Sequence, residues 1–179
     1  MPRRLTVLGL LLASCGYRFT AAGGPLPGGV KSIDVPVLKN QTTEPGVEGL
    51  LTGEIRHRLD QLGYGGSSGE RATLLGTVVG SGAAPVAPKV SNPAPPPPLP
   101  PLRPGFSVND PGIYVVSLSV SARLQRGDEL LWRADGIAMS ERYLPSDDLA
   151  TMEANRRTAL HRLVQALARE LVARLTAGL

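Results

Sequence analysis

Residues 114–142 decide the fold: they read YVVSLSVSARLQ over 114–125, RGDE over 126–129 and LLWRADGIAMSER over 130–142. In the first run, apolar side chains alternate with small or polar ones, which is typical of a strand with one buried and one solvated face. The turn signal Gly127-Asp128 follows, and the last run returns as a second strand. The segment therefore predicts a long antiparallel hairpin.

The register of this hairpin determines which face carries its arginines. With a three-residue loop, Leu124 lies opposite Trp132 on the buried face. The same register sets Arg123 opposite Arg133 on the solvated face, whereas a two-residue loop would turn Arg133 toward the core. We expect the first register, because it keeps the charge in solvent. Facing like charges destabilise a strand pair unless an anion lies between them, and the neighbouring Asp135 could supply that anion.

A strand, a helix and another strand precede the hairpin. Residues 30–38 alternate as a strand does, and residues 47–62 repeat apolar side chains at helical spacing. Thr43 could cap this helix, and Gly63 is a natural residue to end it. Residues 72–81 predict the next strand. Strand, helix and strand in this order imply a parallel pair joined by a right-handed crossover.

A long helix follows the hairpin, from a cap at Ser146 to about residue 177. Its leucines form an apolar stripe, and arginines line the opposite side, so we expect the helix to dock on the sheet. A basic helix that lies on a membrane is the alternative. With the preceding elements, the chain reads as a small α+β domain.

A proline-rich insertion interrupts this domain at about residues 83–112. Ten of the seventeen prolines of the chain lie between Pro85 and Pro104. Such a composition favours polyproline II or disorder without a core of its own. The insertion is either a solvated excursion between two strands or a ligand for a proline-recognition domain.

The first residues predict an exported, lipid-anchored protein. After Arg3 and Arg4, residues 5–12 are almost entirely apolar but would span only ~12 Å as a helix, against the ~30 Å of a bilayer core. We therefore expect a signal peptide at residues 1–14. Residues 12–15, Leu-Ala-Ser-Cys, resemble the lipobox of bacterial lipoproteins, which predicts acylation of Cys15; an ordinary secretory signal with an incidental cysteine is the alternative. A leader over residues 15–29 and a single domain over residues 30–179 would follow.

Composition and motifs argue against several classes of function. The net charge is +4, or +2 without Arg3 and Arg4, and basic residues are interleaved with acidic ones, so no nucleic-acid partner is expected. His57 and His161 lie on different predicted helices without metal-ligand spacing. No nucleophile motif and no phosphate-binding loop with its lysine is present in the sequence. We expect no enzyme, no metal and no cofactor.

Several motifs together resemble the LptE family of lipopolysaccharide-assembly lipoproteins. They are Cys15-Gly16-Tyr17-Arg18-Phe19 after the lipobox, LPGGV at 26–30, SIDVPV at 32–37, NQTTEPGVE at 40–48 and Glu141-Arg142-Tyr143 before the last helix. The resemblance covers nearly the whole mature chain, although the proline-rich insertion departs from it. It implies a two-layer α+β sandwich with two helices packed on one face of a four-stranded mixed β-sheet.

The resemblance also implies a function: an outer-membrane lipoprotein that plugs and supports the β-barrel LptD and helps to deliver lipopolysaccharide to the cell surface. Gly16 after the acylated cysteine is consistent with delivery to the outer membrane. Lipopolysaccharide carries phosphates, which arginines bind well, so Arg123 and Arg133 are the candidate binding pair. An adaptor that activates an envelope enzyme such as a peptidoglycan synthase is the alternative, and a periplasmic hydrolase is disfavoured.

Overall fold

The computed structural model describes residues 26–66, 69–86 and 112–177. The predicted signal peptide, Cys15 and most of the proline-rich insertion lie outside them. The described elements are η2 (Pro27–Gly29), β1 (Ser32–Asp34), β2 (Lys39–Asn40), α2 (Val47–Gln61), β3 (Arg71–Pro85), β4 (Tyr114–Arg126), β5 (Glu129–Tyr143) and α3 (Leu149–Ala177).

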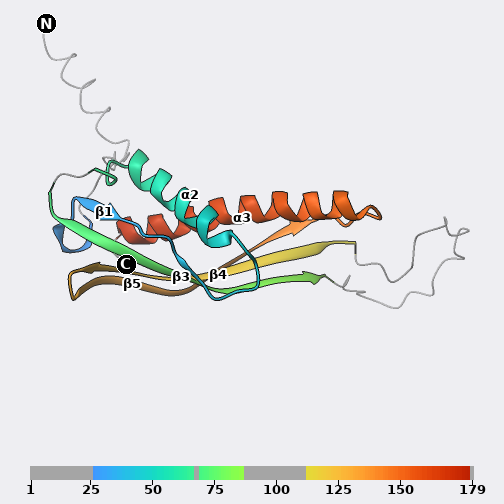
Figure 1. The fold of residues 1–179 in the computed structure, drawn as a ribbon, viewed down its shortest axis with the longest axis horizontal. Helices are drawn as coiled ribbons and strands as arrows, with labels where there is room; N and C mark the ends of the chain where they lie inside the picture. Colours follow the sequence, from blue (N-terminus) through green and yellow to red (C-terminus); the bar gives the residue numbers. More distant parts are fainter. Residues whose placement is uncertain (1–25, 67–68, 87–111, 178–179) are drawn as a thin grey trace, which may run out of the picture.

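These elements form two layers, with both helices on one face of a single sheet (Figure 1). The strand order is β1-β3-β4-β5, and β2 also pairs with β3. β1 and β2 run parallel to β3, whereas β3, β4 and β5 are antiparallel neighbours. The predicted α+β sandwich with a mixed sheet is therefore confirmed.

The first predicted strand is interrupted, giving β1 and β2 instead of one continuous element. Pro36, between them, has no N–H to offer a ladder. The Val35 carbonyl oxygen accepts two hydrogen bonds from the Arg56 guanidinium of α2, at 2.8 and 2.6 Å. The Leu38 N–H donates to the Thr52 hydroxyl oxygen at 3.1 Å. The middle of the segment therefore bonds to α2 rather than to β3.

The ladder between β3 and β4 extends further than predicted. β3 ends at Pro85, which lies opposite Tyr114, and not near residue 81. Just beyond this pair, the Val86 N–H donates to the Ile113 carbonyl oxygen at 2.8 Å. The first residues assigned to the insertion are thus strand. Residues 87–111 therefore connect the ends of two neighbouring strands, β3 and β4.

The hairpin turn is shorter than expected, yet the predicted register holds. Arg126 pairs with Glu129, so the loop is the two residues Gly127-Asp128. A register shift after Leu124 leaves Leu131 as an extra residue on β5, and this bulge compensates for the shorter loop. The predicted cross-strand pairs Arg123–Arg133 and Leu124–Trp132 are confirmed, and Ala122 lies opposite Ala134 in the same register.

The helix caps differ from those predicted. Gly46, with φ +81°, precedes α2 without a side-chain cap, so Thr43 does not serve there. α3 is capped by Asp148, whose Oδ2 accepts hydrogen bonds from the Thr151 N–H at 2.8 Å and the Thr151 hydroxyl at 2.6 Å. These bonds lower the pKa of Asp148. Ser146 therefore lies before the cap, where its hydroxyl accepts from the Asp148 N–H.

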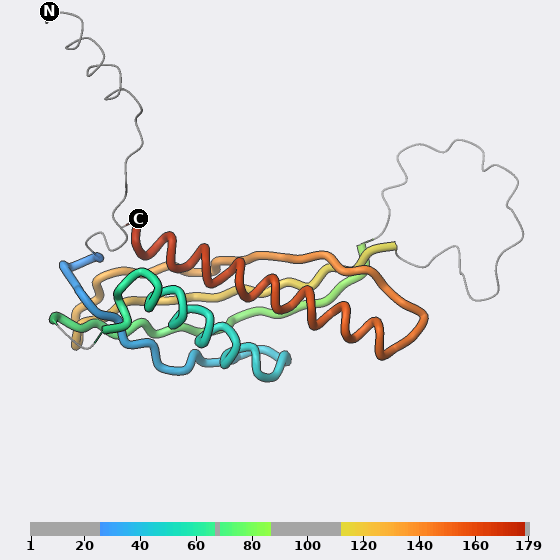
Figure 2. The backbone as a smooth tube through the Cα atoms, turned by 90° about the horizontal axis from the view of Figure 1, so that it is seen from above, coloured from blue at the N-terminus to red at the C-terminus, as the bar shows by residue number. Residues whose placement is uncertain are grey.

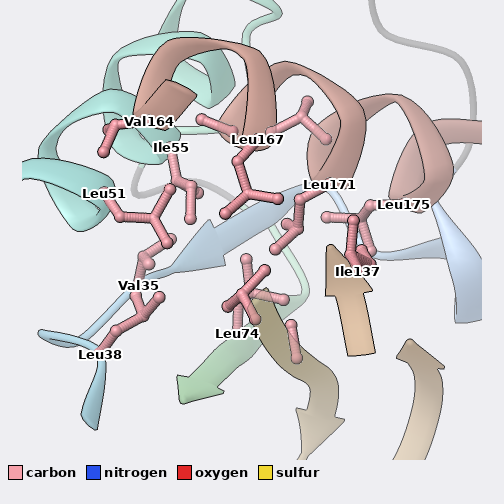
Figure 3. Close-up of a cluster of buried hydrophobic side chains, with 14 of the residues drawn as sticks. Val35, Leu38, Leu51, Ile55, Leu74, Ile137, Val164, Leu167, Leu171 and Leu175 are labelled. Atoms are coloured by element: carbon pink, nitrogen blue, oxygen red, sulfur yellow. The ribbon is translucent and has the colours of Figure 1, made fainter. Parts of the chain in front are cut away.

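The core lies between the helices and the sheet (Figure 3). α3 contributes most of its leucines, and Leu167 and Leu171 are fully buried. α2 adds Leu51 and Ile55, and β3 adds Leu74. Burial of these side chains holds the two layers together, because each is worth roughly 1.5–3 kcal/mol over exposure.

One close contact in this core predicts a destabilising substitution. A Cβ at Gly76 would lie 2.8 Å from Cγ of the buried Leu38. We expect Gly76→Ala to lower the free energy of unfolding by about 1–3 kcal/mol, as overpacked cores do. Urea denaturation measures this change. Gly53→Ala, on an open face of α2, is the matched control and should stabilise by up to about 1 kcal/mol. Equal effects of the two substitutions would contradict the packing argument.

An ionic network ties the start of α3 to the segment before α2. Arg156 contacts Glu44 at 2.7 Å and Glu153 at 2.8 Å, and Arg157 contacts Glu153 at 2.9 Å. The hydrogen bond from Arg156 is the main cause that lowers the pKa of Glu153 from 4.5 to about 2.

This lowered pKa predicts a loss of stability in acid. The ionised Glu153 stabilises the fold at pH values above about 4.5, and this contribution disappears as the pH falls toward 2. Between pH 6 and pH 2, the melting temperature measured by thermal unfolding should fall less for Glu153→Gln than for the natural chain. If the difference in melting temperature between the two proteins stayed constant down to pH 2, the loss of stability could not be assigned to Glu153.

Candidate functional site

The face of the sheet opposite the helices is hydrophilic along β4. Ser117, Ser119 and Ser121 are half-buried there, and Arg123 is exposed. Val116, Leu118 and Val120, which alternate with the serines, point into the core. β4 therefore has one buried and one solvated face, as its sequence predicts.

A hollow of about 600 Å³ lies on this open face. Its floor is formed by β3, β4 and β5, and the segment 36–41 forms one wall. We refer to it as the open-face groove, defined by its charged and most exposed lining residues: Val37, Lys39, Arg123, Leu130, Arg133 and Asp135.

Positive charge dominates the open-face groove. Lys39, Arg123 and Arg133 line it, and among the described residues Asp135 is the only lining carboxylate. Arg133 Nε lies 2.6 Å from Asp135 Oδ2, and both side chains are more than half exposed. Such an exposed ion pair contributes only about 0–1 kcal/mol, so an incoming anion can replace the carboxylate at little cost.

The rim of the open-face groove is apolar. Val37 is 61% exposed and Leu130 is 51% exposed, so both side chains are accessible to a ligand in the groove. Apolar rims beside cationic side chains suit amphiphiles that carry anionic groups. The arrangement can therefore bind an anionic amphiphile.

The structure brings together both arginines that the sequence singled out and adds residues that the sequence reading missed. Lys39 and Gln41 enter the groove because β2 pairs with β3, where the Gln41 N–H donates to the Val78 carbonyl oxygen at 3.0 Å. No local pattern marks this pairing, since β2 has only two residues. Asp135 bonds Arg133, which was one of the two alternatives left open for the arginine pair.

Residues 26–66, 69–86 and 112–177 contain no group of three metal-ligating side chains. His57 and His161 are exposed on different helices. Within the same ranges, no helix has both the length and the apolar character needed to span a bilayer. Cys15 lies outside these residues.

The sequence of the chain matches the model of one protein family over residues 30–175, and that family is LptE, lipopolysaccharide-assembly. The chain belongs to the LptE family. Membership associates it with the bacterial envelope and with lipopolysaccharide assembly by a non-enzymatic lipoprotein. Comparison with curated proteins gives no match.

Two solved structures share the LptE-like fold of this chain. A lipoprotein from Caulobacter crescentus CB15 has a TM-score of 0.52 at 15% identity, covering 83% of this chain and 91% of that one. The rare lipoprotein B from Shewanella oneidensis has a TM-score of 0.51 at 9% identity, covering 80% and 95%. At these identities the likeness concerns the fold alone.

Proposed function

We propose that the chain is an outer-membrane lipoprotein that occupies and supports the LptD β-barrel and helps to deliver lipopolysaccharide to the cell surface. Its membership of the LptE family supports this function. The observation that carries it is the open-face groove, in which Lys39, Arg123 and Arg133 face a single carboxylate. The phosphates of lipopolysaccharide would bind these cations, with Arg123 and Arg133 as the main contacts.

The shape of the domain is compatible with a plug. Both helices cover one face of the sheet (Figure 1) and bury the apolar side chains. On the other face the serines of β4 are half-buried, and Arg123 and Arg133 are exposed. A wide barrel encloses a polar lumen, so a protein inside it needs a closed core and a hydrophilic surface. The open face meets this requirement.

The anchor is part of the same proposal. Residues 1–14 would be removed as a signal peptide, Cys15 would be acylated, and residues 15–29 would connect it to the domain of residues 30–179. Two or more acyl chains give stable membrane attachment, since each buried CH₂ contributes about 0.8 kcal/mol.

Co-purification from membranes in mild detergent tests the function. We expect the full chain to bring down a large, heat-resistant β-barrel in a stoichiometric complex. Recovery of a soluble synthase domain instead would favour the adaptor function, and recovery of neither would contradict the plug. The matched variant Arg123→Ser/Arg133→Ser should still retain the barrel, because we assign those arginines to the glycolipid.

A further inference from the structure

The far end of β5 carries a second surface that the proposed function does not use. β5 is the last strand of the sheet and pairs only with β4 among the described residues. At its hairpin end the strand is irregular: η2 contacts Leu131, and Gly136 with φ +61° follows a register shift. From residue 137 to residue 143 the pairing with β4 is regular, without glycine or proline.

This regular stretch is an open edge. Alternate residues of an edge strand direct their N–H and C=O groups away from the sheet, where they can pair with another strand. Bulges, prolines and inward charges usually protect such edges. Here the bulge lies before residue 137, so it protects only the hairpin half of β5. The regular half carries Glu141 on its helix side, where the carboxylate lies 3.9 Å from Arg162 of α3.

A basic hollow of about 220 Å³ lies beside this edge, between the end of β5 and α3. α3 crosses the sheet obliquely, which is visible from above (Figure 2). Arg142 and Arg162 line the hollow together with Asn155 and Thr158, and none of its lining residues in the described part of the chain is a carboxylate. Leu144, at the end of the strand, is 66% exposed.

The two arginines are poorly neutralised. Arg162 Nη1 reaches Glu141 only at 3.9 Å, with the arginine side chain 67% exposed. Arg142 forms no ion pair with any residue that the structure describes. Arg142 pairs with Val115 on the open side of the sheet, whereas Arg162 lies on the helix side near Glu141. Acidic side chains at two adjacent positions of an added strand point to opposite faces and would meet one arginine each.

We propose that residues 137–143 and the hollow lined by Arg142 and Arg162, together the edge groove, bind an extended acidic segment of a partner polypeptide as an additional strand. Backbone hydrogen bonds to the edge supply affinity, and the arginines select acidic side chains. The edge groove is separate from the open-face groove, so it binds polypeptide whether or not the latter binds glycolipid.

A synthetic peptide tests this inference. The probe is a fluorescent eight-residue peptide that alternates valine and threonine and ends in two aspartates and an amide. We expect saturable binding to the full chain, by fluorescence anisotropy below 1 mM, with amides 137–143 protected from hydrogen exchange. Methylation of alternate backbone nitrogens on one edge of the peptide should abolish binding, and asparagine in place of aspartate should weaken it at least tenfold.

Substitutions in the protein test the same contacts from the other side. Arg142→Gln/Arg162→Gln should weaken binding of the acidic probe at least tenfold. Arg169→Gln, an exposed position of α3 that does not line the hollow, should leave it unchanged. The proposal is overturned if the probe does not bind, if the methylated probe binds equally, if the double variant binds as the natural chain does, or if sedimentation shows that a second copy of the chain already occupies the edge.

Discussion

Replacing Arg123 and Arg133 together by serine is expected to weaken lipopolysaccharide binding by roughly 100-fold. Both guanidinium groups line the open-face groove, and Asp135 bonds only Arg133. Hydrogen bonds to charged groups contribute about 1.5–3 kcal/mol each, and about 1.4 kcal/mol corresponds to a factor of ten in the dissociation constant. Equilibrium titration with fluorescent lipopolysaccharide at fixed ionic strength measures the change.

Two further variants distinguish binding at a specific site from nonspecific attraction by the positive charge of the protein. Asp135→Asn should tighten binding, because it removes the carboxylate that competes for Arg133. Arg169→Ser removes a positive charge from α3, on the other side of the molecule's core, and should have no effect. Unchanged affinity in the double arginine variant, or an equal loss in Arg169→Ser, would remove these arginines from the binding site.

Replacing Cys15 by serine is expected to abolish acylation completely. Cys15 is the only cysteine of the chain, so no other thiol can take the lipid. Metabolic labelling with a palmitate analogue should label the natural chain and leave the variant unlabelled.

Ser14→Ala serves as the control for this experiment, because it keeps a small residue before the cysteine. It should be labelled and membrane-bound like the natural chain. Labelling of the serine variant would refute the lipobox, and secretion of an unlabelled natural chain would support the ordinary signal peptide instead.

The elements with long periodic patterns could be predicted from the sequence. The alternation in β4 and the leucine stripe of α3 each extend over many residues. Over such lengths, the first pattern buries one side only as a strand and the second only as a helix. For the same reason, the buried and solvated faces of the hairpin were assigned correctly, and Arg123 lies opposite Arg133.

The remaining features depend on contacts between distant residues. Arg56 draws the Val35 carbonyl out of the sheet, and nothing in residues 30–38 alone indicates this bond. The groove residue Lys39 follows from that interruption, because it belongs to the separate strand β2. The hairpin loop was predicted one residue too long, since the bulge at Leu131 has no marker in the sequence.

The hydrogen bond between Val86 and Ile113 has a consequence for how this domain tolerates change. The two strands are already joined at the point where residues 87–111 depart, since Pro85 pairs with Tyr114 and Val86 bonds Ile113. Doubling the length of a flexible connection costs only about 0.6 kcal/mol in closure entropy. A change in the length of the sequence between β3 and β4 is therefore expected to leave the pairing of these two strands, and with it the open-face groove, in place.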